Sequence, residues 1–238
     1  MEIAFSDNIW MELAFLVVIP IPVLMIARLA RKGASQWSDA AGAWIAMAIK
    51  GFYLIYFGYV LYMAQQGYFT ENSLPPRILL YSMFPLLGFL LLVVFQLPIT
   101  KRIIASLDLP DLVQLHVFRL IGSFFLMLWA VGKLPALIAW IAGPGDIITA
   151  ISAIFVARTL RKNTSHAVKL TWIWNSFGLL DILLTSATAL YLTKQAIDTG
   201  SQGVEALAAI PFCLIPAFAP ATIIFLHLNV YRKLRAQS

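Results

Sequence analysis

Apolar residues in this chain gather in long runs that alternate with short polar connections. The seven runs cover residues 9–27, 40–63, 78–97, 117–139, 146–160, 169–193 and 206–231. A helix needs about 20 mainly apolar residues to cross a bilayer, and every run except the short fifth approaches that length. The pattern therefore predicts an all-α membrane protein, a compact bundle of about seven transmembrane helices.

The composition of the chain supports a membrane location. Hydrophobic residues make up 61% and charged residues 12%, with a mean hydropathy of +0.85, whereas soluble domains have about 25% charged residues. Seven spans with short connections use nearly all of the 238 residues, so a single polytopic domain, 1–238, is predicted. The net charge of +6 fits basic residues at the ends of spans rather than a nucleic-acid interface, and the lipid bilayer is the expected partner. The sequence predicts no oligomeric state.

Lysine and arginine are distributed unequally between the two sides of the predicted bundle. The connections on one side hold only Arg77 and Lys194. Those on the other side hold twelve basic residues: Arg28, Arg31, Lys32, Lys101, Arg102, Arg158, Arg161, Lys162, Lys169, Arg232, Lys233 and Arg235. Because cytoplasmic connections carry an excess of Lys and Arg, we expect the N-terminus outside and the C-terminus in the cytoplasm of a multi-pass protein of the cell membrane.

Two charged residues of opposite sign lie near the middle of apolar runs, Lys50 in the second and Asp181 in the sixth. A charge at the bilayer centre costs roughly 2.5–3.5 kcal/mol, and such residues mark functional sites by default. We expect an ion pair between them, with Tyr53 one turn after Lys50 on the same helix face. Such a pair is either a lock that fixes the helices or a proton- or ion-linked switch.

The polar residues of the sixth run recur at helical spacing. At about 100° per residue they form one stripe with an asparagine at its flank. The stripe contains Trp174, Gly178, Asp181, Thr185 and Thr188, and the flanking residue is Asn175. Because polar groups facing lipid would lack hydrogen-bond partners, this face is predicted to point into the bundle. The glycine and threonines could equally form a packing surface, but packing alone rarely requires a carboxylate.

A Gly-Pro-Gly sequence at 143–145 separates the fourth and fifth runs and predicts a helix break. We expect residues 135–142 to lie flat in the outer interface, which would bring Lys133 to Asp146 as an outer-side ion pair. An aspartate after a break is also an ordinary N-cap. Arg119 falls at the inner edge of the fourth run, where its side chain can extend to the interface.

The connection 98–117 is amphipathic in part, with Leu109, Leu112 and Val113 among its apolar residues, and is predicted to lie on the inner membrane surface. Asp108 and Pro110 are typical of the start of such a helix.

The seventh run contains three prolines, Pro211, Pro216 and Pro220. Each lacks an amide donor, so a kink or an unwound stretch is predicted between Pro211 and Pro220. The freed carbonyls would be available to a cation, water or solute, as in the discontinuous helices of transporters. The alternative is a membrane helix without a binding role, since proline is more frequent in membrane helices than in soluble ones.

The three histidines, His116, His166 and His227, all map to the cytoplasmic side of the predicted topology. A metal or haem site would need two or more of them to converge, and no spacing typical of metal motifs is present. They are weak metal candidates, and we expect no metal and no cofactor. Cys213, the single cysteine, excludes an intrachain disulfide and a cysteine-cluster metal site.

These patterns favour a small-solute or proton-linked transporter or binding protein, without enzymatic activity. The expected ligand or ion pathway comprises Lys50, Tyr53, Asn175, Asp181, Thr185, Pro216 and Pro220. One alternative is an accessory subunit or sensor whose polar core is structural. Another is a membrane-embedded oxidoreductase that uses the cytoplasmic-side histidines. The sequence identifies no substrate, reaction or coupling ion.

Overall fold

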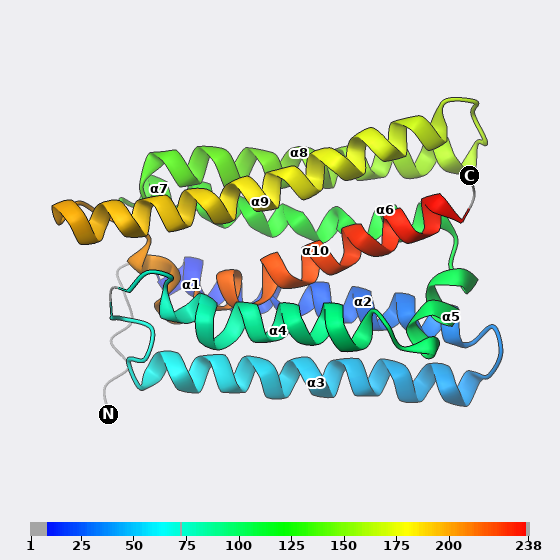
Figure 1. The fold of residues 1–238 in the computed structure, drawn as a ribbon, viewed down its shortest axis with the longest axis horizontal. Helices are drawn as coiled ribbons and strands as arrows, with labels where there is room; N and C mark the ends of the chain where they lie inside the picture. Colours follow the sequence, from blue (N-terminus) through cyan, green and yellow to red (C-terminus); the bar gives the residue numbers. More distant parts are fainter. Residues whose placement is uncertain (1–8, 72, 237–238) are drawn as a thin grey trace.

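The computed structural model describes residues 9–71 and 73–236, and this part of the chain is helical without any strand (Figure 1). The first and last residues of the predicted single domain, 1–8 and 237–238, lie outside the described residues. Most helices run along the long axis of the molecule, as expected for a bundle of apolar segments. The all-helical prediction is confirmed for the described residues.

The elements follow one another with short connections. They are α1 (Ile9–Val18), α2 (Pro20–Ala34), α3 (Asp39–Gln65), η1 (Leu79–Met83), α4 (Phe84–Gly88), η2 (Phe89–Val94), α5 (Pro98–Ser106), α6 (Leu109–Leu115), η3 (His116–Gly122), α7 (Ser123–Ala130), α8 (Ala136–Arg161), α9 (Ala167–Thr199), η4 (Glu205–Leu207) and α10 (Leu214–Arg235). Of the η elements, η1 and η2 are π-helical, whereas η3 and η4 are 3-10 helices.

Six helical segments in the described part are long and apolar enough to cross a membrane. They are Ile9–Ala34, Asp39–Gln65, Leu109–Ala130, Ala136–Arg161, Ala167–Thr199 and Leu214–Arg235. A further pair, Leu79–Val94 and Pro98–Ser106, is bent by 83° and would make a seventh crossing if counted as one span. The fold therefore has six candidate spans, or up to seven, against the predicted seven.

The candidate span that corresponds to the fourth predicted run begins earlier than predicted, at Leu109 instead of residue 117. Asp108 has the extended backbone of an N-cap residue, and Pro110 occupies the first turn, where a missing amide costs nothing. The sequence signals of a helix start at these two residues are confirmed. The expectation that this segment lies along the membrane surface is wrong, because Leu109, Leu112 and Val113 are buried in the bundle.

The predicted break at 143–145 is also wrong, because α8 is continuous from Ala136 to Arg161. Residues 135–142 are therefore not a separate interfacial helix; Pro135 is the N-cap and 136–142 are the first turns of α8. The two glycines allow close packing instead of a break. A Cβ atom at Gly143 would lie 2.7 Å from Leu126 Cγ, and one at Gly145 would collide with the Asp181 carboxylate.

The last candidate span starts at Leu214 instead of residue 206. Residues 211–213 form turns ahead of the helix, and Pro216 lies in its first turn, where its missing amide is not needed. Only Pro220 lies inside the helix. The predicted unwound stretch is therefore confined to the chain before the span, and 214–220 is helical.

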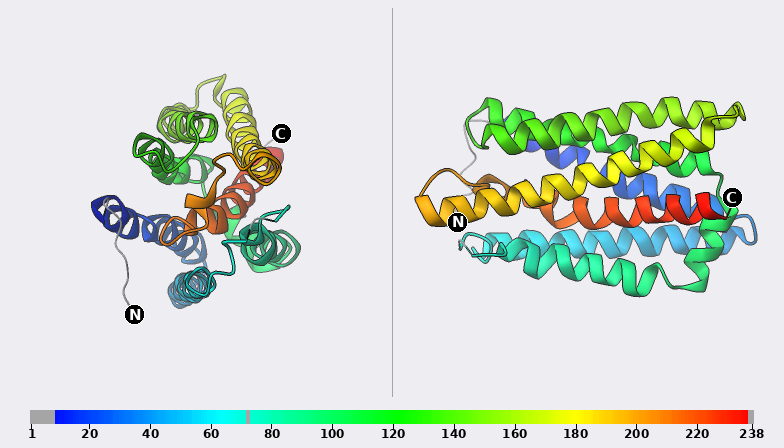
Figure 2. Two further views of the ribbon diagram at one scale, coloured as in Figure 1. Left: turned by 90° about the vertical axis from the view of Figure 1, so that its left-hand side faces the viewer. Right: turned by 45° about the horizontal axis from the view of Figure 1, so that its top comes forward.

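α10 lies at the centre of the bundle, as the view along the long axis shows (Figure 2, left). It contacts α3, α4, α5, α6, α9 and the η elements on both sides of α4. Apolar side chains of α10 such as Phe218 and Ala221 join those of α1, α3 and α4 in the largest buried cluster. Leu226 and Val230, farther along α10, pack in two smaller clusters with α6 and α9.

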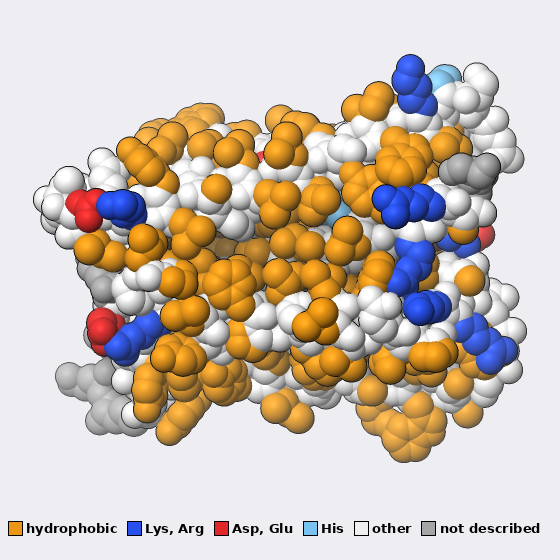
Figure 3. Space-filling view, in the orientation of Figure 1, with side chains coloured by type: hydrophobic (Ala, Val, Ile, Leu, Met, Phe, Trp, Pro, Cys, Tyr) orange, Lys and Arg blue, Asp and Glu red, His pale blue; other side chains and the backbone are white. Residues whose placement is uncertain are grey.

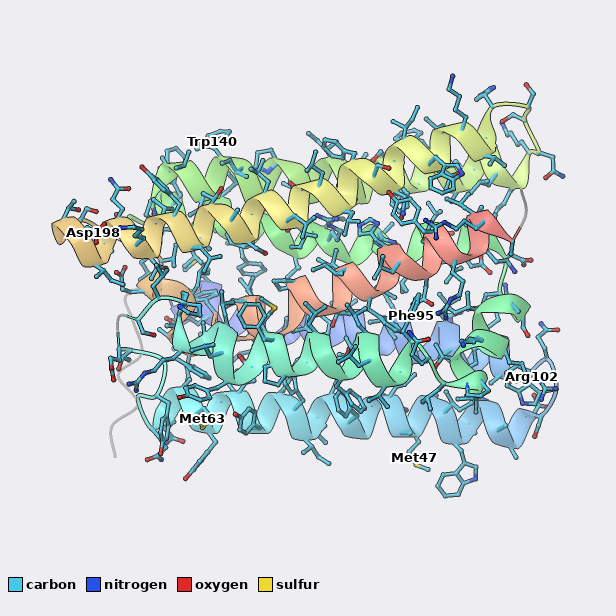
Figure 4. The ribbon with its side chains drawn as sticks, viewed as in Figure 1. Met47, Met63, Phe95, Arg102, Trp140 and Asp198 are labelled. Atoms are coloured by element: carbon cyan, nitrogen blue, oxygen red, sulfur yellow. The ribbon has the colours of Figure 1, made fainter. Side chains whose placement is uncertain are left out.

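The outer surface matches the pattern expected of a membrane protein. Apolar side chains cover the middle of the molecule, and on the face shown Lys and Arg side chains gather at one end (Figure 3). This is the C-terminal end, where α8 and α10 finish and Arg102 of α5 lies, whereas Asp198 lies at the opposite end (Figure 4). Met47 and Trp140 point outward from the bundle and are 51% and 56% exposed.

Candidate functional site

Arg119 is the only arginine that is completely buried among the described residues, with 0% exposure. It lies in η3, ten residues after the first residue of the span Leu109–Ala130. At a rise of about 1.5 Å per residue this places its Cα about 15 Å into the span, half of a hydrocarbon core of about 30 Å. The side chain is therefore an ionisable group in the middle of this candidate span, and a charge at the centre of a bilayer needs partners.

The guanidinium group of Arg119 is held by acceptors from three helices. Nε donates to Asp146 Oδ1 of α8 at 2.6 Å, and Nη2 donates to Asp181 Oδ2 of α9. Nη1 donates to the carbonyl oxygen of Gly178, also on α9, at 2.8 Å. Both aspartate residues are themselves at most 8% exposed. One arginine thus bridges α8 and α9 through two buried ion pairs.

His227 of α10 is the remaining acceptor of this arginine. Its Nε2 lies 3.1 Å from Arg119 Nη1, and its Nδ1 lies 2.8 Å from Asn175 Oδ1. Because an arginine only donates, Nε2 must accept, and the ring is the neutral tautomer with its proton on Nδ1. The Asn175 amide agrees with this assignment, since its Nδ2 donates to the His227 carbonyl oxygen at 3.1 Å.

His116 completes the group from the start of η3. Its Nδ1 lies 3.1 Å from the Leu112 carbonyl oxygen, and its ring centroid lies 4.4 Å from that of His227. The Trp174 ring contacts both histidines edge-on or tilted, and its Nε1 donates to the carbonyl oxygen of Thr149. We call the following residues the polar cluster: His116, Arg119, Asp146, Asn175, Asp181 and His227.

Three glycines let the helices approach closely enough for these contacts. A Cβ atom at Gly122 or Gly145 would collide with Asp146 or Asp181 respectively. One at Gly178 would lie 2.7 Å from His227 Cε1. Each position thus leaves space that a side chain of the polar cluster occupies, so the cluster depends on backbone packing as well as on charge.

The predicted pairing of Lys50 with Asp181 is wrong. Lys50 is exposed on the outer side of α3, and the cation that contacts Asp181 is Arg119. The prediction failed because α3 and α9 were assumed to be neighbours, whereas α9 packs on α8 and α10.

The predicted outer pair is wrong as well. Lys133 Nζ lies 3.8 Å from Glu12 Oε1, and Asp146 pairs with Arg119. Asp146 is not an N-cap, because it lies ten residues inside the continuous helix α8.

The polar stripe of the sixth predicted span is confirmed as an inward face. The five residues of the stripe and the flanking asparagine are all buried: Trp174, Asn175, Gly178, Asp181, Thr185 and Thr188. Thr188 donates to the carbonyl oxygen of Leu184, which fits the packing interpretation for the threonines. Asn175, Gly178 and Asp181 form hydrogen bonds with the arginine or its histidine partner, and Trp174 contacts that histidine through its ring.

The other predicted pathway residues lie apart from the polar cluster. The Tyr53 hydroxyl lies 3.1 Å from the Thr222 hydroxyl, and Pro220 is buried on α10. Pro216 lines a small cavity of about 60 Å³ near the N-terminal end. Their roles in a pathway stay predictions.

The three histidines do not form one site. His116 and His227 are in contact, but His166 is exposed in the turn before α9. Within residues 9–71 and 73–236 no three His, Cys, Asp or Glu side chains are grouped so that they could hold a metal ion. The three-histidine metal candidate is therefore corrected to a pair of buried histidines next to an arginine.

A larger cavity of about 660 Å³ opens at the C-terminal end. Its lining comes from the starts of α6 and α9 and the ends of α8 and α10, and includes Asp111, Arg161 and Lys233. Asp111 is paired there with Lys32 and with Arg161 Nη2, the latter at 3.1 Å. No residue of the polar cluster lines either of the two cavities.

Sequence reasoning missed Arg119 as the centre of the site because it placed the residue at a membrane edge. The helix start predicted at Asp108 and Pro110 opens the span itself and not a separate surface helix, which moves Arg119 to the middle of that span. Asp146 was missed for the related reason that the Gly-Pro-Gly sequence was interpreted as a helix end.

Comparison with known proteins gives a family but no activity. No curated protein and no solved structure matches the chain. Residues 75–235 match the model of one protein family, described as a domain of unknown function, DUF8737. The matched segment contains the whole polar cluster and leaves out α1, α2 and α3. Because the match covers more than half of the 238 residues, the chain belongs to the DUF8737 family.

Proposed function

We propose that this chain is an integral membrane protein in which proton binding at the polar cluster is linked to the movement of a small solute. The observation that carries the proposal is the formal charge of the cluster. Arg119 contributes one positive charge, Asp146 and Asp181 contribute two negative charges, and His227 is neutral because it accepts from the arginine. One negative charge is left over.

A surplus charge at this depth favours a switch over a simple lock. A lock needs one carboxylate for one arginine, whereas an uncompensated charge in the middle of a bilayer costs roughly 2.5–3.5 kcal/mol. The cluster therefore gains from binding one more positive charge. We assign that charge to a proton because neither cavity reaches the cluster, and a proton can pass along hydrogen-bonded groups where a hydrated ion cannot.

The membrane orientation follows from the distribution of basic residues. The C-terminal end, with Arg102, Arg161 and Lys233, is assigned to the cytoplasm, and the start of α1 to the outside. Seven crossings, with the bent pair counted as one, are consistent with ends on opposite sides.

The two end cavities suggest how a solute would reach the bundle. The cavity at the C-terminal end measures about 660 Å³ and the one near the N-terminal end about 60 Å³. α10 lines both, through Lys233 and Pro216, and carries His227 between them. In the proposal the larger cavity opens to the cytoplasm in this conformation, and proton binding at the polar cluster changes how α10 packs on α9.

The first test counts protons bound by the purified protein in detergent. An indicator dye in weak buffer reports the uptake when the pH is lowered from about 8 to 5, a range in which ordinary carboxylates stay ionised. We expect Asp181→Asn and Asp146→Asn each to bind fewer protons per chain than the wild type. The matched control is Asp198→Asn, an exposed carboxylate on the same helix α9, which should bind as many as the wild type. Equal uptake in all four proteins would overturn the proposal.

The second test separates transport from sensing. Proteoliposomes loaded with a pH-sensitive dye are exposed to pools of amino acids, sugars, organic acids and organic cations, and solute-dependent proton flux is recorded. Flux that requires Asp181 supports the transporter. Proton uptake without flux for any pool would favour the sensor, which fits the enclosed position of the cluster between two cavities that do not reach it.

A further inference from the structure

One nitrogen atom beside the polar cluster has no hydrogen-bond partner. Nε2 of His116 is buried without a hydrogen-bond partner, and the residue is 0% exposed. Two other buried side-chain atoms of the described residues share this property, Asn229 Oδ1 and Arg232 Nη1, but both lie on α10 near its end. His116 differs because its ring contacts His227.

The protonation state of His116 follows from its other nitrogen. Nδ1 lies 3.1 Å from the Leu112 carbonyl oxygen, which can only accept, so Nδ1 carries the proton. Nε2 then carries a lone pair that accepts no hydrogen bond. Leaving a buried acceptor unpaired costs about 1–3 kcal/mol. A proton arriving at this atom would find a free site.

The winding of η3 places His116 close to the charges of the cluster. In a 3-10 helix, side chains three residues apart lie directly above one another, so His116 and Arg119 share one face of η3. The titratable and charged groups around His116 are His227 from α10, Arg119 on η3 itself, and Asp146 of α8 and Asp181 of α9, which the arginine holds. The Leu112 carbonyl of α6 and the Trp174 ring of α9 also contact it.

We infer that His116 Nε2 is the position at which the polar cluster takes up its proton. This inference rests on the proposed function. A hydronium ion gives its proton to the Nε2 lone pair, an N–H bond forms, and a water molecule is left. The imidazolium and Arg119 together then balance Asp146 and Asp181, so the buried group becomes formally neutral. The step needs no other reactant.

The position of His116 along the bundle assigns the side from which the proton arrives. α6, the helix that leads to His116, starts at Leu109. Leu109 and Asp111 line the cavity at the C-terminal end. His116 lies five residues after Asp111, which is about 8 Å along a helix axis, and three residues before Arg119. It therefore stands between the open cavity and the ion pairs. Leu112 and Val113, which lie between Asp111 and His116 in the chain, are buried and separate the cavity from His116 in this conformation.

The experiment compares His116→Gln with His166→Gln, because His166 is exposed and lies outside the cluster. Proton uptake over the pH range used above should fall in His116→Gln to the level of Asp181→Asn. His166→Gln should keep the part of the proton uptake that is lost in Asp181→Asn. Since loss of the acceptor removes a proton-transfer group, solute-dependent flux should fall at least about tenfold in His116→Gln and stay unchanged in His166→Gln.

Nitrogen NMR of histidine-labelled wild-type protein gives a readout that does not depend on a stable variant. The His116 ring is assigned by its coupling to the labelled Leu112 carbonyl. We expect its Nε2 signal to change from an unprotonated to a protonated nitrogen as the pH is lowered, and the change to be lost in Asp181→Asn.

The outcomes separate the two proposals. Full proton uptake in His116→Gln, or an Nε2 signal that stays unprotonated at low pH, would overturn the inference about His116 and leave the proposed function intact. Absence of any cluster-dependent proton uptake in the wild type would overturn the proposed function itself.

Discussion

Replacement of Arg119 by leucine tests whether its ion pairs hold the bundle together. The change removes the donors of four hydrogen bonds, to Asp146, Asp181, Gly178 and His227, and leaves two carboxylates buried without a cation. Removing one partner of a buried ion pair costs about 3–5 kcal/mol. For a chain of this size each kcal/mol lowers the melting temperature by about 2–4 °C, so Arg119→Leu should melt about 6–20 °C below the wild type.

Thermal melting of the detergent-purified protein, followed by tryptophan fluorescence, measures this loss. Lys50→Leu is the matched control, because it also removes a positive charge from the middle of an apolar helix, but from an exposed position. It should melt at or above the wild-type temperature. The triple variant that adds Asp146→Asn and Asp181→Asn to Arg119→Leu should recover part of the loss, since no charge is then left unpaired. An Arg119→Leu protein that melts within about 2 °C of the wild type would refute the reasoning.

Two further predictions concern packing and orientation. Gly145→Ala should destabilise the protein by about 1–3 kcal/mol, because the added methyl group collides with the Asp181 carboxylate; Gly58→Ala, which faces open space on α3, should not, and equal melting temperatures would contradict the close approach. Reporter fusions should show a cytoplasmic location after Asn163 and an external location after Gly200, and the opposite pattern would reverse the proposed orientation.

The inward face of α9 could be predicted because it depends on local sequence only. The spacing from Trp174 to Thr188 is a property of one helix, and polar groups at mid-depth have to face protein. The candidate spans could also be predicted from local sequence, because they follow from the lengths of the apolar runs. Such features follow from helix geometry and from the bilayer thickness, and no knowledge of neighbouring helices is needed.

The partner of Asp181 could not be predicted, because it depends on which helices are adjacent. The nearest candidate by sequence pattern was Lys50, but α3 turns that residue outward. Arg119 became recognisable only once the start of its span was known, and a shift of eight residues moved it from the interface to the interior. The alignment of His116 with Arg119 could not be predicted either, because the fourth run was predicted to begin at residue 117, which left His116 outside the helix.

The 3-10 winding of η3 also gives the span a length that depends on the helix type of these residues. Its seven residues, His116–Gly122, rise about 14 Å as a 3-10 helix but about 10.5 Å as an α-helix, and they turn about 140° farther in the tighter form. Rewinding η3 into an α-helix would therefore shorten the span by about 3.5 Å and at the same time rotate α7 relative to α6 about the helix axis. The same rewinding would carry His116 and Arg119 out of alignment. A distance between spin labels on α6 and α7 that changes with pH would reveal this motion, and a constant distance would show that η3 is a rigid spacer.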